Sequence, residues 1–395
     1  MKEAVIVSAV RTAVGRAPRG ALCHMRPEAM GAAVLKDLLQ RTPGLDPKDI
    51  DDVIVGCSFP EAEQGVNLGR VLVAAAGLPQ EVSGLTVNRF CSSGLQAIAQ
   101  ACERIMTDQA DIVIGGGVES MSMIPMGGNL MYPLKEIIDT HPGAYEPMGL
   151  TAENVAERCG INRGDQDIFA YQSQMKASAA VKEGRFKEQI VPLSVEQQKF
   201  NAQTGKYEFS HLTFDTDEGI RPDTTVAALA ALRPAFKPTG TVTAGNSSQT
   251  SDGSAAVMVM SKKKAKELGL KPMATFRGFQ VAGCEPEVMG LGPIYAIPKL
   301  MKRTGRSLEE IDLFELNEAF ASQALACMRE LKLNPDKVNV NGGAIALGHP
   351  LGCTGAKLTT QLVYEMVRRN VRYGVVSMCI GFGMGAAGLF ERENY

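Results

Sequence analysis

The 395-residue sequence contains no tryptophan, only four histidines and no apolar run as long as a membrane span. A transmembrane helix needs about 20 consecutive apolar residues, so we expect none here. The nine cysteines are odd in number and never follow a Cys-x-x-Cys spacing, which argues against a disulfide framework and against a zinc or other metal site. The net formal charge of −2 argues against nucleic acid as a main partner.

The cysteine pattern is typical of a reduced compartment, and we expect a cytoplasmic protein. A predicted strand begins at Ala4, which leaves no room for a signal peptide. The last three residues, Glu393, Asn394 and Tyr395, are not a peroxisomal address.

Short apolar strands alternate with helical patterns along the first 120 residues. Such alternation predicts an α/β fold with a mostly parallel sheet and helices on its faces. The predicted strands cover residues 4–10, 51–57, 85–87 and 111–114, and the predicted helices cover residues 27–39, 67–76 and 95–106.

Part of this pattern recurs after residue 274. Residues 45–55, 87–94 and 111–117 are echoed in the same order by residues 307–316, 340–349 and 373–383. The period is too long for a solenoid, so we interpret the chain as two similar halves. We predict an N-terminal half at 1–120 completed by a strand at 248–270, a loop domain at 121–247 that covers the site, and a C-terminal half at 271–395.

Ligand sites in α/β sheets lie beyond the carboxyl ends of strands. Equivalent predicted strand ends in the two halves carry Cys91, Asn317, His349 and Cys379. We therefore expect these four side chains to converge between the halves.

Cys91 lies where a predicted strand turns into a helix. The free N–H groups and the partial positive charge of a helix N-terminus favour a thiolate, and hence a nucleophile. The alternative is a small buried hydrophobic residue, which is the usual role of a free cysteine.

His349 lies in a loop with five glycines between residues 341 and 355, next to Pro350. An imidazole in such a loop is a candidate general base, and a structural histidine in a turn is the alternative. Cys379 ends another predicted strand, ahead of glycines whose N–H groups can stabilise an oxyanion.

Several motifs together resemble the thiolase family, and the resemblance runs from Val5 to Arg392. They are Asn88-Arg89-Phe90-Cys91-Ser92-Ser93-Gly94, Thr151-Ala152-Glu153-Asn154, Thr243-Ala244-Gly245-Asn246-Ser247-Ser248, Asn317-Glu318-Ala319-Phe320, residues 341–355, and Cys379-Ile380-Gly381. The family fold implied is a five-layer αβαβα arrangement built from two βαβαβαββ halves plus a loop domain that binds coenzyme A.

The resemblance also implies a role for each matching residue. Cys91 matches the nucleophile that accepts the acyl group, and His349 matches its base. Cys379 matches the acid/base that moves the proton of the α-carbon. Asn317 matches the residue whose water forms one oxyanion hole with His349, and the N–H groups of Cys91 and Gly381 match the other.

Coenzyme A contacts are implied at Met148, Arg221, Ala244 and Ser248. The chain departs from the family pattern just before Met148, where Pro147 replaces a histidine. The resemblance implies that coenzyme A is a co-substrate, that no cofactor is permanently bound, and that the chain forms a homodimer or homotetramer. A complex with a hydratase and hydroxyacyl-CoA dehydrogenase subunit is a further expectation.

Three motifs resemble degradative 3-ketoacyl-CoA thiolases, which cleave their substrates in fatty acid β-oxidation. They are Asn88-Arg89-Phe90-Cys91, Glu146-Pro147-Met148-Gly149 and Met289-Gly290-Leu291-Gly292-Pro293. The small and flexible apolar residues between 123 and 151 predict room for a longer acyl chain, although packing of the loop domain is an alternative explanation.

Three other functions remain as alternatives. The first is an acetoacetyl-specific acetyl-CoA acetyltransferase. The second is a ketoacyl synthase, which the scarcity of histidines and the presence of Cys379 argue against. The third is a non-catalytic acyl-CoA or lipid-binding scaffold, which the presence of all four candidate catalytic residues argues against.

Overall fold

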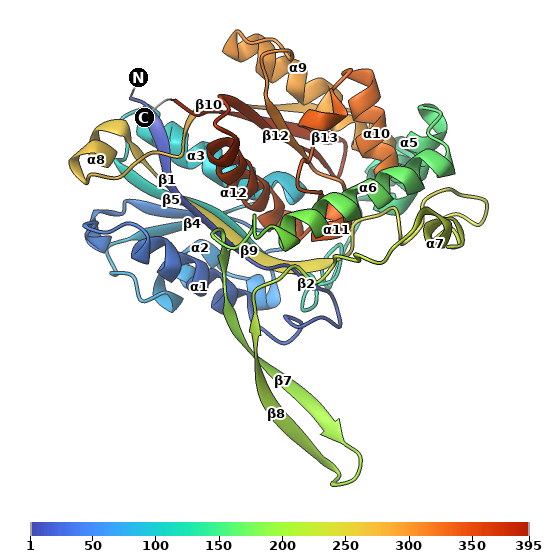
Figure 1. Ribbon diagram of the computed structural model, residues 1–395, viewed down its shortest axis with the longest axis horizontal. Helices are drawn as coiled ribbons and strands as arrows, with labels where there is room; N and C mark the ends of the chain where they lie inside the picture. The colour runs from blue at the N-terminus through green and yellow to red at the C-terminus, as the bar shows by residue number, and fades with distance from the viewer. Residues whose placement is uncertain (1, 394–395) are drawn as a thin grey trace.

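The computed structural model describes residues 2–393 (Figure 1). Met1, Asn394 and Tyr395, which include one end of each predicted terminal half, lie outside the described residues. The strands are β1 (Ala4–Thr12), β2 (Gly15–Arg16), β3 (Asp52–Gly56), β4 (Ser83–Val87), β5 (Ile112–Ser120), β6 (Ile190–Val191), β7 (Leu193–Asn201), β8 (Lys206–Phe214), β9 (Ser251–Ser261), β10 (Ala274–Gly283), β11 (Leu313–Leu316), β12 (Tyr373–Ile380) and β13 (Met384–Glu391).

The helices alternate with these strands. They are α1 (Pro27–Gln40), α2 (Leu68–Ala75), α3 (Ser93–Met106), α4 (Lys135–Thr140), α5 (Met148–Arg158), α6 (Arg163–Lys182), α7 (Val226–Ala230), α8 (Lys262–Glu267), α9 (Gly292–Thr304), α10 (Ala321–Glu330), α11 (Ala344–Leu347) and α12 (Leu351–Arg369). Among the described residues, none of these helices combines the length and apolar character needed to cross a membrane.

The two halves have the same strand order. In the N-terminal half the strands lie in the order β4-β3-β5-β9-β1. In the C-terminal half Val338 bridges to Phe314 of β11, and β12, β13 and β10 follow. Parallel and antiparallel neighbours also match, so the prediction of two similar halves is confirmed. The domain boundaries stay a prediction.

The expectation of a mostly parallel sheet is wrong, because the sheet is mixed. β3 lies parallel to β4 and β5, but β9 runs antiparallel to both β5 and β1. In the second half, the short turn at 381–383 joins β12 to β13, and so short a connection allows only antiparallel pairing.

Three apolar clusters define the layers. The central cluster combines α3 and α12 with side chains from β5, β9 and β12. A second cluster packs α1 and α2 on the outer face of the N-terminal strands, and a third packs α9 and α10 on the outer face of the C-terminal strands. Successive residues of β5 alternate between clusters, with Val113 in the central one and Ile112 and Ile114 in the outer one. Outer helices, strands, central helices, strands and outer helices therefore stack in the five predicted layers.

The central helices α3 and α12 approach closely at their N-terminal ends. A Cβ atom on Gly94 would lie 2.7 Å from the backbone nitrogen of Ala356, and one on Gly355 would lie 2.3 Å from that of Leu95. Glycine therefore permits the helix starts, and the turns that precede them, to lie side by side.

The region between β5 and β9 carries α4 to α7 and a two-stranded hairpin. Strands β7 and β8 pair antiparallel and project away from the body of the molecule (Figure 1). Helices α5 and α6 contact α10, so this region packs against the C-terminal half.

Candidate active site

Cys91 lies in a 3-10 turn, Phe90–Ser92, between β4 and α3. His349 lies in the turn between α11 and α12. Because α3 and α12 pack at their N-terminal ends, these two turns meet. The turn of Cys91 also contacts β12, whose penultimate residue is Cys379.

The thiol of Cys91 is only 8% exposed. The backbone N–H groups of Gly381 and of Cys91 itself favour the thiolate and lower the pKa of the thiol. Burial outweighs both and raises the pKa of the thiol to about 12. The N–H groups thus act in the direction expected from the sequence, but the cost of removing a negative charge from water exceeds their contribution, and the resting group is a neutral thiol.

The imidazole of His349 is held at both nitrogens. Nδ1 lies 2.6 Å from the hydroxyl of Thr354, and Nε2 lies 3.3 Å from the amide nitrogen of Asn317. An amide that donates to Nε2 leaves the ring proton on Nδ1, where it is donated to Thr354. Burial, together with the positive charge of Lys357, lowers the pKa of His349 to about 3, so the ring is neutral with Nε2 as its acceptor.

Cys379 is completely buried in a small apolar cluster. Burial is the largest cause that raises the pKa of this thiol well above its ordinary value, and the proximity of the Cys91 thiol is the next. The turn of Cys91 contacts β12, so the two cysteines lie on neighbouring elements. The structure therefore brings together the elements of Cys91, Cys379 and Gly381, and it pairs His349, on the turn before α12, with Asn317, which follows β11.

Two phenylalanines join the turns that carry Cys91 and Gly381. Phe90 and Phe382 have positive φ angles of 42° and 63°, and their rings stack 5.6 Å apart with an interplanar angle of 11°. Tyr145 packs edge-on against Phe382 at 5.1 Å. Left-handed backbone at non-glycine residues costs on the order of 1 kcal/mol each, so the stack compensates for strain concentrated beside the site.

Glu119 is a buried residue beside the site that the sequence motifs did not indicate. Glu119, at the end of β5, accepts hydrogen bonds from the backbone of Ser58 (2.8 Å) and Gly352 (2.7 Å) and from the side chain of Gln64 (2.9 Å). It thus ties a loop of the N-terminal half to the start of α12. The available signal was a charged residue at the end of an apolar, glycine-rich strand.

The predicted coenzyme A residues are spread over the loop region. Met148 begins α5, and its sulfur lies 3.7 Å from the position a Cβ of Gly381 would take. Ser248 is half-buried and donates its N–H to the carbonyl of Ala319 at 2.9 Å. Arg221 and Ala244 are exposed. Met148 is therefore the one that touches the catalytic turns directly.

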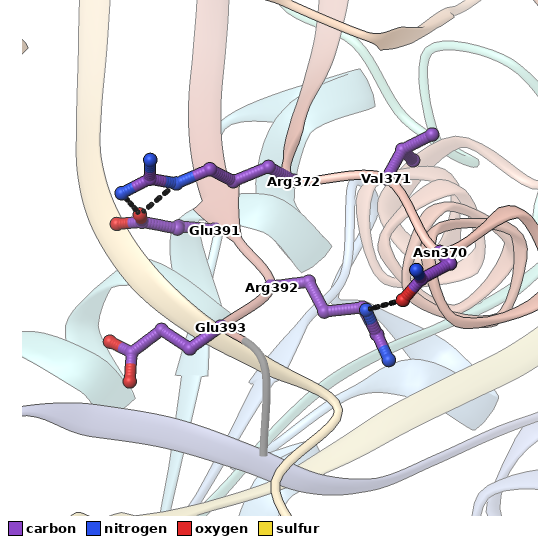
Figure 2. A pocket seen from close by; sticks show the side chains of 6 residues that line it. All are labelled: Asn370, Val371, Arg372, Glu391, Arg392 and Glu393. Atoms are coloured by element: carbon purple, nitrogen blue, oxygen red, sulfur yellow. Dashed lines mark hydrogen bonds and ion pairs between the residues drawn. The ribbon is translucent and has the colours of Figure 1, made fainter.

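A cavity of about 410 Å³ lies far from these residues, at the opposite end of β12 from Cys379 (Figure 2). Arg372 and Glu391 form an ion pair there at 2.6 Å, and Arg392 donates to Asn370. Because its charged groups pair with one another, this cavity is part of a surface ion-pair network and not a second reaction centre.

Comparison with known proteins points in one direction. The family models "Thiolase, N-terminal domain" and "Thiolase, C-terminal domain" match residues 4–263 and 270–392. A 3-ketoacyl-CoA thiolase of Bacillus subtilis is 55% identical over 391 residues, covering 99% of this chain and 100% of that protein. A 3-ketoacyl-CoA thiolase of Aliivibrio fischeri is 47% identical, with the same coverage. The crystal structure of the Bacillus anthracis acetyl-CoA acetyltransferase matches with a TM-score of 0.89, at 40% identity over 99% of both chains.

Proposed function

The chain belongs to the thiolase family, and on that premise we propose that it is a degradative 3-ketoacyl-CoA thiolase. It cleaves 3-ketoacyl-CoA with coenzyme A to acetyl-CoA and an acyl-CoA shortened by two carbons. The observation that carries this proposal is the meeting of a neutral thiol, a second thiol and a neutral imidazole at the facing turns of two similar halves.

In the first step, the amide of Asn317 releases Nε2 of His349, which takes the proton of the Cys91 thiol, and the sulfur attacks the 3-keto carbon. The N–H groups of Gly381 and Cys91, which favour negative charge on the thiol, stabilise the resulting alkoxide. Each such donor contributes on the order of 3–4 kcal/mol to transition-state stabilisation. The bond between C2 and C3 then breaks, which leaves an acyl thioester on Cys91 and the enolate of acetyl-CoA.

In the second step, the thiol of Cys379 donates its proton to C2 of the enolate. The protonated His349, together with a water held by Asn317, stabilises the enolate oxygen. The Oδ1 atom of Asn317 is buried without a hydrogen-bond partner among residues 2–393, which supports its role in binding a polar group.

The acyl group then passes to coenzyme A. The Cys379 thiolate takes the proton of the incoming thiol, whose sulfur attacks the acyl thioester. Collapse of this intermediate releases the shortened acyl-CoA, and His349 returns its proton to Cys91. The proton balance closes with all three side chains in their starting states, so no resident cofactor is needed.

The surroundings of this reaction are also proposals. Coenzyme A enters as a co-substrate along Met148, Arg221, Ala244 and Ser248. The chain works in the cytoplasm as a homodimer or homotetramer, with a hydratase and dehydrogenase subunit as a further partner. Support for a protein interface comes from apolar side chains exposed between residues 126 and 138, among them Leu130 (70%) and Tyr132 (83%).

Acetyl-CoA acetyltransferase activity is the second candidate, because a solved structure with that title shares the fold at 40% identity. The higher identity to two 3-ketoacyl-CoA thiolases, 55% and 47%, supports the degradative reaction.

The direct test is to mix the purified protein with coenzyme A and a medium-chain 3-ketoacyl-CoA. The absorbance of the 3-ketoacyl-CoA should fall while acetyl-CoA and the shortened acyl-CoA appear in equal amounts. Binding of the acyl-CoA without cleavage would instead support the scaffold hypothesis.

A further inference from the structure

The peptide bond between Gly348 and His349 is held at both ends by side chains. Nζ of Lys357 donates to the carbonyl of Gly348 at 3.2 Å, and the N–H of His349 donates to the hydroxyl of Ser251 at 3.1 Å. Gly348 has φ +83° and ψ 161°, a backbone conformation open mainly to glycine. These two hydrogen bonds, made by side chains of α12 and β9, therefore fix the peptide plane next to the imidazole.

Lys357 is unusual because it is fully buried in the second turn of α12. A buried ammonium group is costly unless a carboxylate pairs with it. Asp217 is already engaged by Arg11 in a two-pronged ion pair with distances of 2.7 and 2.8 Å. No ion pair to Lys357 occurs within residues 2–393. Its hydrogen bond to the carbonyl of Gly348, in the loop of His349, is therefore the contact that accounts for its burial.

We propose that Lys357 is a positioning residue for the thiolase reaction, which fixes the Gly348 carbonyl and thereby orients the imidazole of His349 toward Cys91. Ser251 is the second support of the same peptide. This inference rests on the proposed function for the identity of the reaction.

The charge of Lys357 adds a second effect. A cation near an imidazole disfavours protonation of the ring, and Lys357 is among the causes that lower the pKa of His349. Burial lowers the pKa of Lys357 itself to about 8, so the ammonium is present at neutral pH. Loss of the charge therefore raises the pKa of His349 and protonates the base at a higher pH.

Other charged groups also face Lys357. They are Arg11 on β1, Asp217 in the segment after β8, Glu315 on β11 and Cys353 on α12. Arg11 and Asp217 neutralise each other. Burial raises the pKa of Glu315 to about 8, and that of Cys353 to about 12, so both are mainly neutral at pH 7. Lys357 thus supplies the net charge near the His349 loop.

The experiment compares Lys357→Met, Lys357→Arg and Ser251→Ala, with Thr360→Val as the control. Thr360 is buried on the same helix, and its hydroxyl donates to Ala356, away from the His349 loop. The measurements are kcat and KM for thiolysis, and the rate at which iodoacetamide alkylates Cys91, each from about pH 3, near the pKa of His349, to about pH 9.

For Lys357→Met we expect kcat to fall about 10- to 100-fold with KM for coenzyme A changed by less than about twofold, because the site is misaligned and not emptied. The acid limb of both pH profiles should move to higher pH. Lys357→Arg should keep the wild-type acid limb and recover most of kcat. Ser251→Ala should lower kcat without moving the limb, and Thr360→Val should change neither.

The proposal is overturned if Lys357→Met keeps the wild-type kcat and pH profile. It is also overturned if Lys357→Arg and Lys357→Met lose activity equally with an unmoved limb, since that result marks Lys357 as a packing residue. If Lys357→Met does not fold, an unchanged kcat in Ser251→Ala refutes the peptide clamp. A wild-type protein that does not cleave 3-ketoacyl-CoA refutes the proposed function instead, and the alkylation profile still tests the role of Lys357.

Discussion

The turn before α3 and the turn before α12 occupy equivalent places in the two halves, yet they are built differently. The groups that favour negative charge at Cys91 belong to the backbone, namely the N–H groups of its own residue and of Gly381. His349 is held by side chains, namely Thr354 and Asn317 at the ring and Ser251 and Lys357 at its peptide.

The difference follows from what each group must do. A sulfur atom accepts from any direction, so two N–H groups suffice to favour its negative charge and later that of an oxyanion. An imidazole has two distinct nitrogens, and only one tautomer in one orientation presents an acceptor to the thiol. Burial keeps both groups neutral, since it raises the pKa of Cys91 and lowers that of His349. The two similar halves thus provide equivalent positions for the two turns, and the different contacts around Cys91 and His349 give these residues different chemical roles.

The largest expected effect comes from removing the thiol of Cys91. Cys91→Ala should lower kcat/KM for thiolysis by at least about 10,000-fold, because the covalent route is lost. Peptide mass spectrometry after brief exposure of the wild type to an acyl-CoA should place the acyl group on Cys91. An acyl group on Cys379 would reverse the assignment of the two thiols.

The next largest effect distinguishes the roles of Cys379 and His349 in acylation and in thiolysis. Cys379→Ala should lose thiolysis by at least about 1,000-fold, since the proton of the α-carbon is no longer moved, but should still take an acyl group from a simple acyl-CoA onto Cys91. His349→Ala should lose both acylation and thiolysis. If Cys379→Ala loses acylation as fully as thiolysis, the proposed division of labour is wrong.

A smaller effect tests the helix contact that brings the turns together. In Gly94→Ala the added Cβ would lie 2.7 Å from the nitrogen of Ala356 and 2.9 Å from the carbonyl oxygen of Gly352, both rigid backbone atoms. We expect a loss of about 1–3 kcal/mol in unfolding free energy, seen as a lower Tm by calorimetry, with slower acylation of Cys91.

Gly164→Ala is the matched control for that change. Gly164 lies near the start of α6, where the nearest contact of an added Cβ is the side-chain oxygen of Asn162 at 3.3 Å. Its Tm should stay the same or rise slightly. A Tm for Gly94→Ala equal to that of the control would show that α12 moves aside freely, and the facing turns would then not depend on this contact.

The smallest effect concerns substrate length. The loop region brings Met148 against Gly381, and each added methylene of an acyl chain buried there should contribute up to about 0.8 kcal/mol. We expect kcat/KM to rise at least about tenfold from the four-carbon 3-ketoacyl-CoA to a medium-chain one, measured at saturating coenzyme A. A preference for the four-carbon substrate would favour the acetyl-CoA acetyltransferase alternative.

The sequence by itself determined the features that are written in local patterns. Alternating apolar segments predicted the strands and helices, and the echoes after residue 274 predicted two similar halves, which the matching strand orders confirm. Motifs around Cys91 and His349 indicated the family. These features depend on neighbouring residues and on the order of segments, both of which can be read directly from the sequence.

The tertiary structure alone decided the direction of strands β9 and β13, the protonation of the site and its buried support. Whether Cys91 is a thiol or a thiolate depends on burial by residues far away in the sequence, which local helix geometry does not include. Glu119 of β5 and Ser251 of β9 reach α12 and the His349 loop from distant parts of the chain, and Lys357 of α12 folds back onto Gly348. Desolvation and hydrogen bonding act over a few ångströms in space, and distance in space is not encoded in distance along the chain.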